Sequence, residues 1–273
     1  EKFDAVSNID EIIETSDGIM VARGDLGIEV PYYDVPTIQK MLIKKSNAKG
    51  IPVITATQML LSMTQNERAT RAEISDVANA VLDGTDIVML SEESAVGENP
   101  VNVVETMHNI ISQTEKIFDH EKRYKFTYLD EFDVIQATVT KLADDLSADG
   151  ILSLTSSGNS ARKMSRYRPI TPLYTFAHDK ETLTGLTALW GVEPITTVKE
   201  AQASKMIQRM LRSLEKREIL NKKGLYICTV GYPVGIPGST NTIKILTPSE
   251  IEFYLNFKEN REKIKTEKKV NLA

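Results

Sequence analysis

The amino-acid sequence predicts an α/β protein of two successive domains, each built from parallel strands joined by helices. Three apolar segments in the first third end in polar residues, and amphipathic helical patterns separate them. They are residues 19–22, 51–56 and 86–90. A second series of strand segments begins at Gly150, after a charged and aperiodic stretch. This alternation indicates parallel strands with crossover helices, in an open sheet or in a barrel.

The composition is that of an ordinary soluble globular protein. The 273 residues carry 33 Lys and Arg against 38 Asp and Glu, a net charge of −5, so no nucleic-acid partner is expected. No membrane association is expected either, because no apolar run approaches the roughly 20 residues of a spanning helix and no signal peptide opens the sequence. The single Cys228 fits a reducing cytoplasm. Since the first residue is Glu1 and not Met, we interpret the sequence as part of a longer protein.

Helical patterns follow the strands of the first third. Residues 3–15 place apolar side chains on one stripe, and a second helix runs from Pro36 to a C-cap at Gly50. Residues 70–73, Thr-Arg-Ala-Glu, have the spacing of a capping box and begin a third helix. A fourth helix begins at Pro100. These are three strand–helix units, whereas a closed barrel of eight units takes about 250 residues.

The polar residues at the three strand ends are the candidate functional site. The first strand ends in Arg23-Gly24-Asp25-Leu26-Gly27, where a carboxylate suited to a hard cation lies between glycines that allow close backbone approach. The second strand ends in Thr57 and the third in Ser91. Since the carboxyl ends of parallel strands open on one face, Asp25, Thr57 and Ser91 are expected to converge. The alternative is ordinary structure, because such residues also form turns and helix caps.

Three motifs of the first third are specific in their order and spacing. They are Met20-Val21-Ala22-Arg23-Gly24-Asp25-Leu26-Gly27-Ile28-Glu29, Ala56-Thr57-Gln58-Met59-Leu60, and Thr70-Arg71-Ala72-Glu73 followed by Ser75-Asp76-Val77-Ala78-Asn79-Ala80-Val81-Leu82-Asp83-Gly84. Together they resemble pyruvate kinase, and the resemblance extends to about residue 248. It implies the last strand–helix units of a TIM barrel, residues 1–120, a linker, 121–133, a doubly wound α/β effector-binding domain, 134–250, and a charged tail, 251–273.

The resemblance also implies an activity and residues that carry it. The family transfers the phosphoryl group of phosphoenolpyruvate to ADP, which gives pyruvate and ATP in glycolysis. Glu1 and Asp25 correspond to its ligands for Mg²⁺ or Mn²⁺. The substrate carboxylate is expected against the N–H groups of Gly24 and Asp25 and the hydroxyl of Thr57. Thr57 and Ser91 correspond to positions near the enolpyruvate carbon, which a water relay protonates.

Assembly and activity of the 273 residues are further expectations from the resemblance. Arg71 corresponds to an arginine that reaches the neighbouring subunit's Arg-Gly-Asp segment in a homotetramer, although it could also be an ordinary exposed residue. The family's catalytic lysine lies two positions before Glu1, and its K⁺ ligands also lie upstream. The 273 residues alone are therefore expected to show no kinase activity. The sequence departs from the family at Glu92, where a glycine is usual.

The second domain contains two candidate ligand loops. Its last strand follows a loop without a helix and is expected at an antiparallel edge. The loop after its first strand offers hydroxyls and N–H groups at a helix N-terminus, which suits the phosphate of a sugar phosphate or a nucleoside monophosphate. Simple helix capping is the alternative. The candidate phosphate residues are Thr155, Ser156, Ser157, Gly158, Asn159 and Ser160, and the resemblance implies an effector loop with Gly235, Pro237 and Gly238.

Two other functions stay open beside that of a pyruvate kinase fragment. In the first, the chain is a non-enzymatic regulatory piece that binds a phosphorylated ligand through its second domain. In the second, it belongs to another barrel enzyme that uses phosphoenolpyruvate. A lysine two positions upstream of Glu1 would favour pyruvate kinase over both.

Overall fold

The computed structural model describes residues 1–120, 127–200, 202–231 and 240–257. The chain divides into two compact units, which are described separately. Unit 1 comprises Glu1–Thr127 with Ala188–Trp190, and unit 2 comprises Tyr128–Thr187 with Gly191–Ala273. Over the described ranges, none of the helices combines the length and the apolarity that crossing a membrane requires.

Unit 1 contains a parallel sheet with the strand order β1-β2-β3, as the strand–helix alternation predicts. The strands are β1 (Ile19–Ala22), β2 (Val53–Ala56) and β3 (Ile87–Met89). In their register Ala22 lies beside Ala56, and Ala56 beside Met89. The three carboxyl ends are therefore level with one another at one edge of the sheet.

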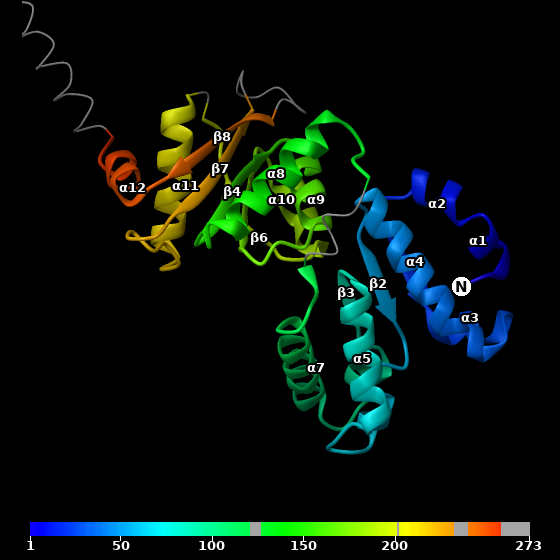
Figure 1. The fold of residues 1–273 in the computed structure, drawn as a ribbon. Coiled ribbons are helices and arrows are strands. Elements are labelled where there is room, and N and C mark those ends of the chain that lie inside the picture. The colour runs from blue at the N-terminus through cyan, green and yellow to red at the C-terminus, as the bar shows by residue number, and fades with distance from the viewer. Residues whose placement is uncertain (121–126, 201, 232–239, 258–273) are drawn as a thin grey trace, which may run out of the picture. The chain divides into compact units, whose positions relative to one another are not determined.

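Two helices precede β1, and helices follow each strand of unit 1 (Figure 1). They are α1 (Phe3–Ser7), α2 (Ile9–Thr15), α3 (Arg23–Glu29), α4 (Val35–Lys49), α5 (Arg71–Asp83), α6 (Glu92–Ala95) and α7 (Pro100–Glu115), with 3-10 turns η1 (Tyr32–Asp34) and η2 (Leu61–Thr64). One apolar cluster packs α2 and α4 against β1 and β2, and a second joins α5 and α7. The single helix expected over residues 3–15 is interrupted at Asn8, whose side chain and backbone N–H both donate to the Asp4 carbonyl and end α1.

The predicted capping box begins α5. The Thr70 hydroxyl accepts from the Glu73 N–H at 3.2 Å, and the Glu73 carboxylate accepts from the Thr70 N–H at 2.8 Å. The same carboxylate accepts from the N–H and the hydroxyl of Ser62 at 2.7 and 2.5 Å. Partial burial acts to raise the pKa of Glu73, but the hydrogen bonds from Ser62 and Thr70 outweigh it and lower that pKa. Glu73 thus joins α5 to the turn η2 that follows β2.

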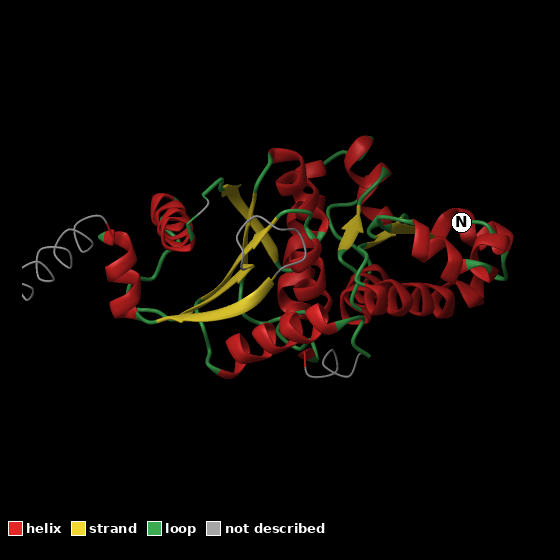
Figure 2. Cartoon of the chain, turned by 90° about the horizontal axis from the view of Figure 1, so that it is seen from above, coloured by secondary structure: helices red, strands yellow, loops and turns green. Residues whose placement is uncertain are grey.

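Unit 2 contains a five-stranded sheet in the order β6-β5-β4-β7-β8. Its strands are β4 (Gly150–Thr155), β5 (Leu173–Ala177), β6 (Val192–Thr197), β7 (Tyr226–Gly231) and β8 (Thr240–Leu246). Neighbouring strands are parallel except β7 and β8, so the predicted antiparallel edge strand is confirmed. Figure 2 shows helices on both sides of this sheet. They are α8 (Glu131–Asp145), α9 (Asn159–Arg166), α10 (Lys180–Gly185), with the 3-10 turn η4 (Leu186–Ala188), α11 (Ala203–Lys216) and α12 (Pro248–Leu255).

Alternating side chains of the sheet supply two cores. Leu152 and Cys228 pack on the face that α11 and α12 cover, whereas Ile151 and Ile227 pack on the face that α8 and α9 cover. Because helices cover both faces of the sheet, β4 and β7 are buried at nearly every position.

Two expected domain boundaries differ from the observed elements. The linker expected over 121–133 ends earlier, because the Asp130 carboxylate accepts from the Asp133 N–H at 2.8 Å and caps α8. The boundary expected at residue 250 falls inside α12, because the buried Ile251 completes the core beside α11. Of the expected charged tail, residues 258–273 lie outside the described residues.

Replacing Glu73 by alanine should lower the free energy of unfolding of unit 1 by about 1–2 kcal/mol at neutral pH, because it removes a cap and the link to Ser62. The folded-state pKa is lowered, so this contribution is complete above the ordinary value of 4.5 and is lost as the pH falls through the folded value. Urea denaturation at neutral and at acidic pH measures both effects. Glu105→Ala, at an exposed position of α7, is the control. A difference of equal size at both pH values would contradict the titration of Glu73.

Cys228 should resist alkylation in the native protein at about pH 8, because only the accessible thiolate reacts. The side chain is fully buried, and burial raises the pKa of its thiol from 9.0 to about 12. The protonated thiol contributes stability that is complete below pH 9.0 and is lost as the pH rises towards about 12. Mass spectrometry after iodoacetamide treatment measures the modified fraction. Equal labelling rates with and without denaturant would show that the thiol is accessible.

Candidate active site

The structure brings the three predicted strand ends to one edge of the unit 1 sheet. Gly24 and Asp25 lie in the first turn of α3, directly after β1, and Thr57 directly follows β2. Ser91 lies between β3 and α6. The Gly24 N–H donates to Thr57 Oγ1 at 2.9 Å, which joins the first two ends. The side chain that joins the third end is Glu93, described below.

The segment whose glycines are expected to allow close backbone approach forms the helix α3. Neither Gly24 nor Gly27 has a left-handed φ, and a Cβ added at Gly24 would come no closer than 3.5 Å to Thr57 Oγ1. The left-handed residues are Thr57, with φ 69°, and Gln58, with φ 54°. For a β-branched residue this conformation costs about 1–3 kcal/mol and persists only where surrounding contacts impose it. The strained backbone of this site is therefore at the end of β2.

Arg23 supplies one set of those contacts. Its side chain is only 9% exposed, and its Nε and Nη2 atoms donate to the carbonyls of Ala56 and Thr57 at 2.6 to 3.3 Å. Its Nη1 pairs with Asp76 on α5 at 2.5 Å and donates to Gln39 on α4 at 3.5 Å. One planar guanidinium thus joins the ends of β1 and β2 to two helices, which the single ammonium of a lysine cannot do.

Glu93 supplies the second set of contacts. Its side chain is 1% exposed, and its Oε1 atom accepts from the N–H groups of Met59 and Leu60, both at 3.2 Å. Its Oε2 atom accepts from the Ser91 N–H at 2.7 Å. Glu93 therefore joins the end of β2 to the end of β3. Glu92, the departure from the family pattern, is exposed in the first turn of α6.

The two carboxylates predicted to hold a metal are exposed and lie near a common cation. Lys2 pairs with Glu29 at 2.6 Å, and this hydrogen bond and charge raise the pKa of Lys2, with smaller contributions in the same direction from Glu1 and Asp25. Hard carboxylate oxygens suit Mg²⁺, which usually keeps several waters and substrate oxygens as ligands. Within the part of the chain that the structure describes, no three His, Cys, Asp or Glu side chains form a metal cluster. Glu1 and Asp25 are thus two exposed carboxylates that both act on the charge of Lys2.

A cavity of about 400 Å³ lies beside the start of α3. Its lining includes Arg23, Gly24 and Gln58, together with residues of η1 and the start of α4. Ile28 and Tyr32 also line it, although both are largely exposed. This hollow makes the strand ends accessible from solution.

The predicted phosphate loop of unit 2 connects β4 to α9. Thr155 Oγ1 accepts from the Gly158 N–H at 2.9 Å, and Gly158, with φ 83°, is the N-cap of α9. Because glycine lacks a side chain, no side-chain cap closes the N-terminus of this helix. Ser160 Oγ lies 3.0 Å from Thr240 Oγ1, so the loop lies beside the start of β8.

The other predicted effector residues differ in exposure. Ser157 and Asn159 are exposed, whereas Ser156 is half-buried and its carbonyl accepts from the Thr182 hydroxyl at 3.4 Å. The predicted effector-loop residues Gly235, Pro237 and Gly238 lie outside the described residues. Arg71, predicted at a subunit contact, is exposed at the first position of α5.

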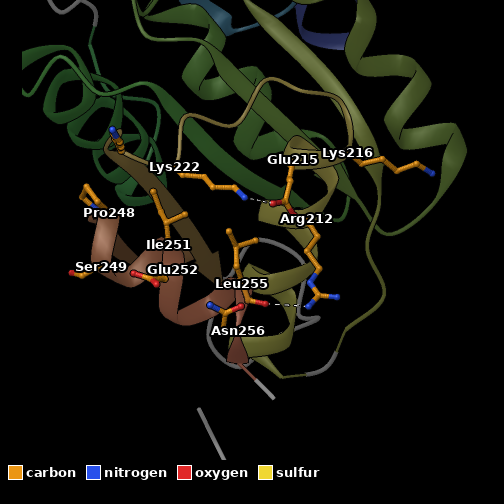
Figure 3. A pocket seen from close by; sticks show the side chains of 11 residues that line it. Arg212, Glu215, Lys216, Lys222, Pro248, Ser249, Ile251, Glu252, Leu255 and Asn256 are labelled. Carbon is orange, nitrogen blue, oxygen red and sulfur yellow. Dashed lines mark hydrogen bonds and ion pairs between the residues drawn. The ribbon is translucent and has the colours of Figure 1, made fainter. Parts of the chain in front are cut away.

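A larger cavity of unit 2, of about 810 Å³, lies between α11 and α12 (Figure 3). Lys222 pairs there with Glu215 at 2.6 Å, and Arg212 donates to the Leu255 carbonyl at 3.1 Å. Its lining comes from the segment before β7 and from α12, after β8, so it lies at the N-terminal edge of the parallel strands. Residues 155–160 follow the carboxyl end of β4, at the opposite edge.

Comparison with known families matches both units. Residues 1–104 match the family described as "Pyruvate kinase, barrel domain", and residues 133–246 match the family described as "Pyruvate kinase, alpha/beta domain". The first match ends within α7, and the second begins within α8.

Individual relatives give the same result. Pyruvate kinase of Lactobacillus delbrueckii subsp. bulgaricus is 43% identical over 251 residues, which cover 90% of this chain and 43% of that protein. Pyruvate kinase of Clostridium acetobutylicum is 43% identical over 249 residues, 90% of this chain and 53% of that protein. A crystal structure of a pyruvate kinase from Cryptosporidium parvum aligns with a TM-score of 0.82 and 36% identity, over 89% of this chain and 49% of that one. The chain therefore spans about half the length of these relatives.

Replacing Arg23 by lysine should lower the free energy of unfolding of unit 1 by about 2–3 kcal/mol, because buried carbonyls and Asp76 lose hydrogen bonds that an ammonium cannot supply together. Arg68→Lys, at an exposed position, is the matched control and should change it by less than about 0.5 kcal/mol. Urea denaturation followed by circular dichroism compares the two variants. Equal midpoints would show that the guanidinium fork is dispensable.

Proposed function

This chain belongs to the pyruvate kinase family, and on that premise we propose that it is part of an enzyme that transfers the phosphoryl group of phosphoenolpyruvate to ADP. The products would be pyruvate and ATP, and the reaction would belong to cytoplasmic glycolysis. The observation that supports this activity best is that the three strand ends lie level at one edge of the sheet. There the Gly24 N–H donates to the Thr57 hydroxyl, and the Glu93 carboxylate accepts from the Ser91 N–H. Because the chain spans about half of its relatives, the activity is proposed for the whole protein.

Glu1 and Asp25 are the proposed ligands of the divalent cation, Mg²⁺ or Mn²⁺. Both carboxylates are exposed, so neither forms a buried structural contact that a cation would have to replace. A bound cation supplies positive charge that offsets the charge of the transferring phosphoryl group. K⁺, which the family also uses, is assigned to residues beyond these 273.

The substrate carboxylate is proposed to bind at Gly24, Asp25 and Thr57. The Gly24 N–H donates to Thr57 Oγ1, and that hydroxyl donates to the Ala56 carbonyl at 2.6 Å. Since a hydroxyl rotates freely, Thr57 can turn its proton towards an arriving carboxylate without backbone movement. The N-terminus of α3 adds a favourable dipole for the same anion. Thr57 and Ser91 then border the carbon that a water-mediated proton transfer would reach.

Unit 2 is proposed to bind a phosphorylated effector at residues 155–160. The support is the N-terminus of α9, which has no side-chain cap, together with the exposed hydroxyl of Ser157. A homotetramer with Arg71 at a subunit contact is proposed from the family alone. The exposure of Arg71 is compatible with that role.

A chimera should test the activity. The residues of the Lactobacillus delbrueckii relative that precede its matched segment are joined to this chain, and ATP formation from phosphoenolpyruvate and ADP is measured. We expect turnover that Asp25→Asn and Thr57→Ala each lower by about 100-fold or more, because they remove a cation ligand and a transition-state contact. Glu92→Gln, on the exposed face of α6, is the control and should leave turnover unchanged. A folded chimera that consumes phosphoenolpyruvate without forming ATP would contradict the proposal, as would one with no turnover.

Thermal unfolding should test the effector site on the chain as it is. A sugar phosphate or nucleoside monophosphate that binds the native state at about 100 times its Kd should stabilise it by about 2.7 kcal/mol. Ser157→Asp should abolish this shift, because it adds a negative charge beside the proposed phosphate. Ser249→Asp, in the cavity at the opposite edge of the sheet, is the matched control and should keep the shift. The proposed effector site would be wrong if none of these ligands shifted the unfolding temperature, or if the shift persisted in the Ser157→Asp variant.

A further inference from the structure

The left-handed turn of Thr57 and Gln58 lies between two buried charged side chains. The Arg23 guanidinium donates to the carbonyls of Ala56 and Thr57, on one side of the turn. The Glu93 carboxylate accepts from the N–H groups of the two residues that follow the turn. The guanidinium cation thus binds the carbonyl oxygens, which carry partial negative charge, and the carboxylate anion binds the N–H groups, which carry partial positive charge. Hydrogen bonds in which one partner is ionised are stronger than those between neutral groups.

The turn itself explains why side chains must supply these contacts. Met59 and Leu60 are completely buried, so water does not reach this stretch freely. Because the chain leaves β2 in a left-handed conformation, the ladder of β2 and β3 ends at the pair Ala56 and Met89. Buried N–H groups without a partner are costly, and the Glu93 carboxylate accepts from the two buried ones of Met59 and Leu60 and from the partly buried N–H of Ser91.

We propose that Glu93 is a positioning residue: its carboxylate, opposed by the Arg23 guanidinium, holds Thr57 in the left-handed conformation that presents its hydroxyl to the Gly24 N–H. Glu93 acts on Thr57 through the backbone N–H groups of Met59 and Leu60, and it is not itself proposed to contact the substrate. The same carboxylate fixes Ser91, so it sets the separation of two strand ends at once. The consequence for substrate binding rests on the proposed function, whereas the conformational effect does not.

The chemistry of Glu93 makes the proposal specific to this side chain. Aspartate is one methylene shorter, so its oxygens cannot reach the N–H groups of both strand ends. Glutamine keeps the length but has one acceptor oxygen, so it can satisfy one strand end and not both. Alanine removes all three hydrogen bonds. Glutamine should therefore rescue part of the effect, and aspartate should not.

Nuclear magnetic resonance of the 273-residue chain should test the proposal without any ligand. Coupling constants and backbone chemical shifts of Thr57 report whether its φ is left-handed, and amide hydrogen exchange reports the hydrogen bond of the Gly24 N–H. In Glu93→Ala and Glu93→Asp we expect Thr57 to lose its left-handed signature and Gly24 to exchange about tenfold faster or more. Glu93→Gln should give intermediate values, and Glu92→Ala, one residue away and exposed, should match the unmodified chain.

A role in stability alone predicts a different result. Exchange would then rise by the same factor at core amides such as those of Val21 and Val81, while Thr57 would keep its left-handed signature in the folded population. That result would overturn the proposal, and so would unchanged signals of Thr57 and Gly24 in the alanine variant. If Glu93→Ala does not fold, the glutamine variant decides, since it keeps the length and shape of the side chain.

The same variants in the chimera separate this proposal from the proposed function. If the chimera turns over and Glu93→Gln raises the KM for phosphoenolpyruvate while Thr57 changes conformation, both proposals stand. An inactive chimera with altered Thr57 signals in the variants removes the proposed function and leaves the positioning role. An active chimera with unaltered Thr57 signals in the variants removes the positioning role alone.

Discussion

Backbone hydrogen bonding at the end of β2 is the constraint on which the first unit depends. The chain leaves this strand through two left-handed residues, so neither the sheet ladder nor a helix can pair the polar groups of the segment. Arg23 and Glu93 do so from neighbouring strand ends. Each buried charge would be unfavourable without its partners, so the contacts that hold the turn also make those charges tolerable inside the protein.

In unit 2, buried side chains of opposite charge likewise pair between two elements, the helices α8 and α9. Asp133 on α8 is fully buried and pairs with the buried Arg166, and it accepts from the Tyr167 hydroxyl at 3.0 Å. Burial raises the pKa of Tyr167, so that hydroxyl stays protonated and keeps donating. Lys163 pairs with Asp130 at the start of α8. These contacts fix the helix whose N-terminus faces the loop of residues 155–160, so the loop begins and ends on rigid elements.

Local patterns were enough to predict the strands, the capping box of α5 and the antiparallel edge strand, because each depends on neighbouring residues or on the length of one connection. The apolar stripe of residues 3–15 was misleading, since one asparagine bonds back to its own helix and interrupts it. The functional roles of the predicted site residues stay predictions, although Gly24 and Thr57 do lie in hydrogen-bond contact. The structural roles of Arg23 and Glu93 were missed, because their partners lie about 34 positions away along the chain. A charged residue just after an apolar strand was the available signal for both.

Threonine at position 57 carries a cost that glycine at that position would avoid, because glycine adopts left-handed φ without steric conflict. Glycine would, however, leave the Gly24 N–H without the hydroxyl that it now contacts. Threonine at this position therefore has a steric cost, and what it adds over glycine is the hydroxyl oxygen that accepts from the Gly24 N–H. Variants of this protein selected only for thermal stability are therefore expected to replace Thr57 by glycine, and to lose the proposed activity as their stability rises.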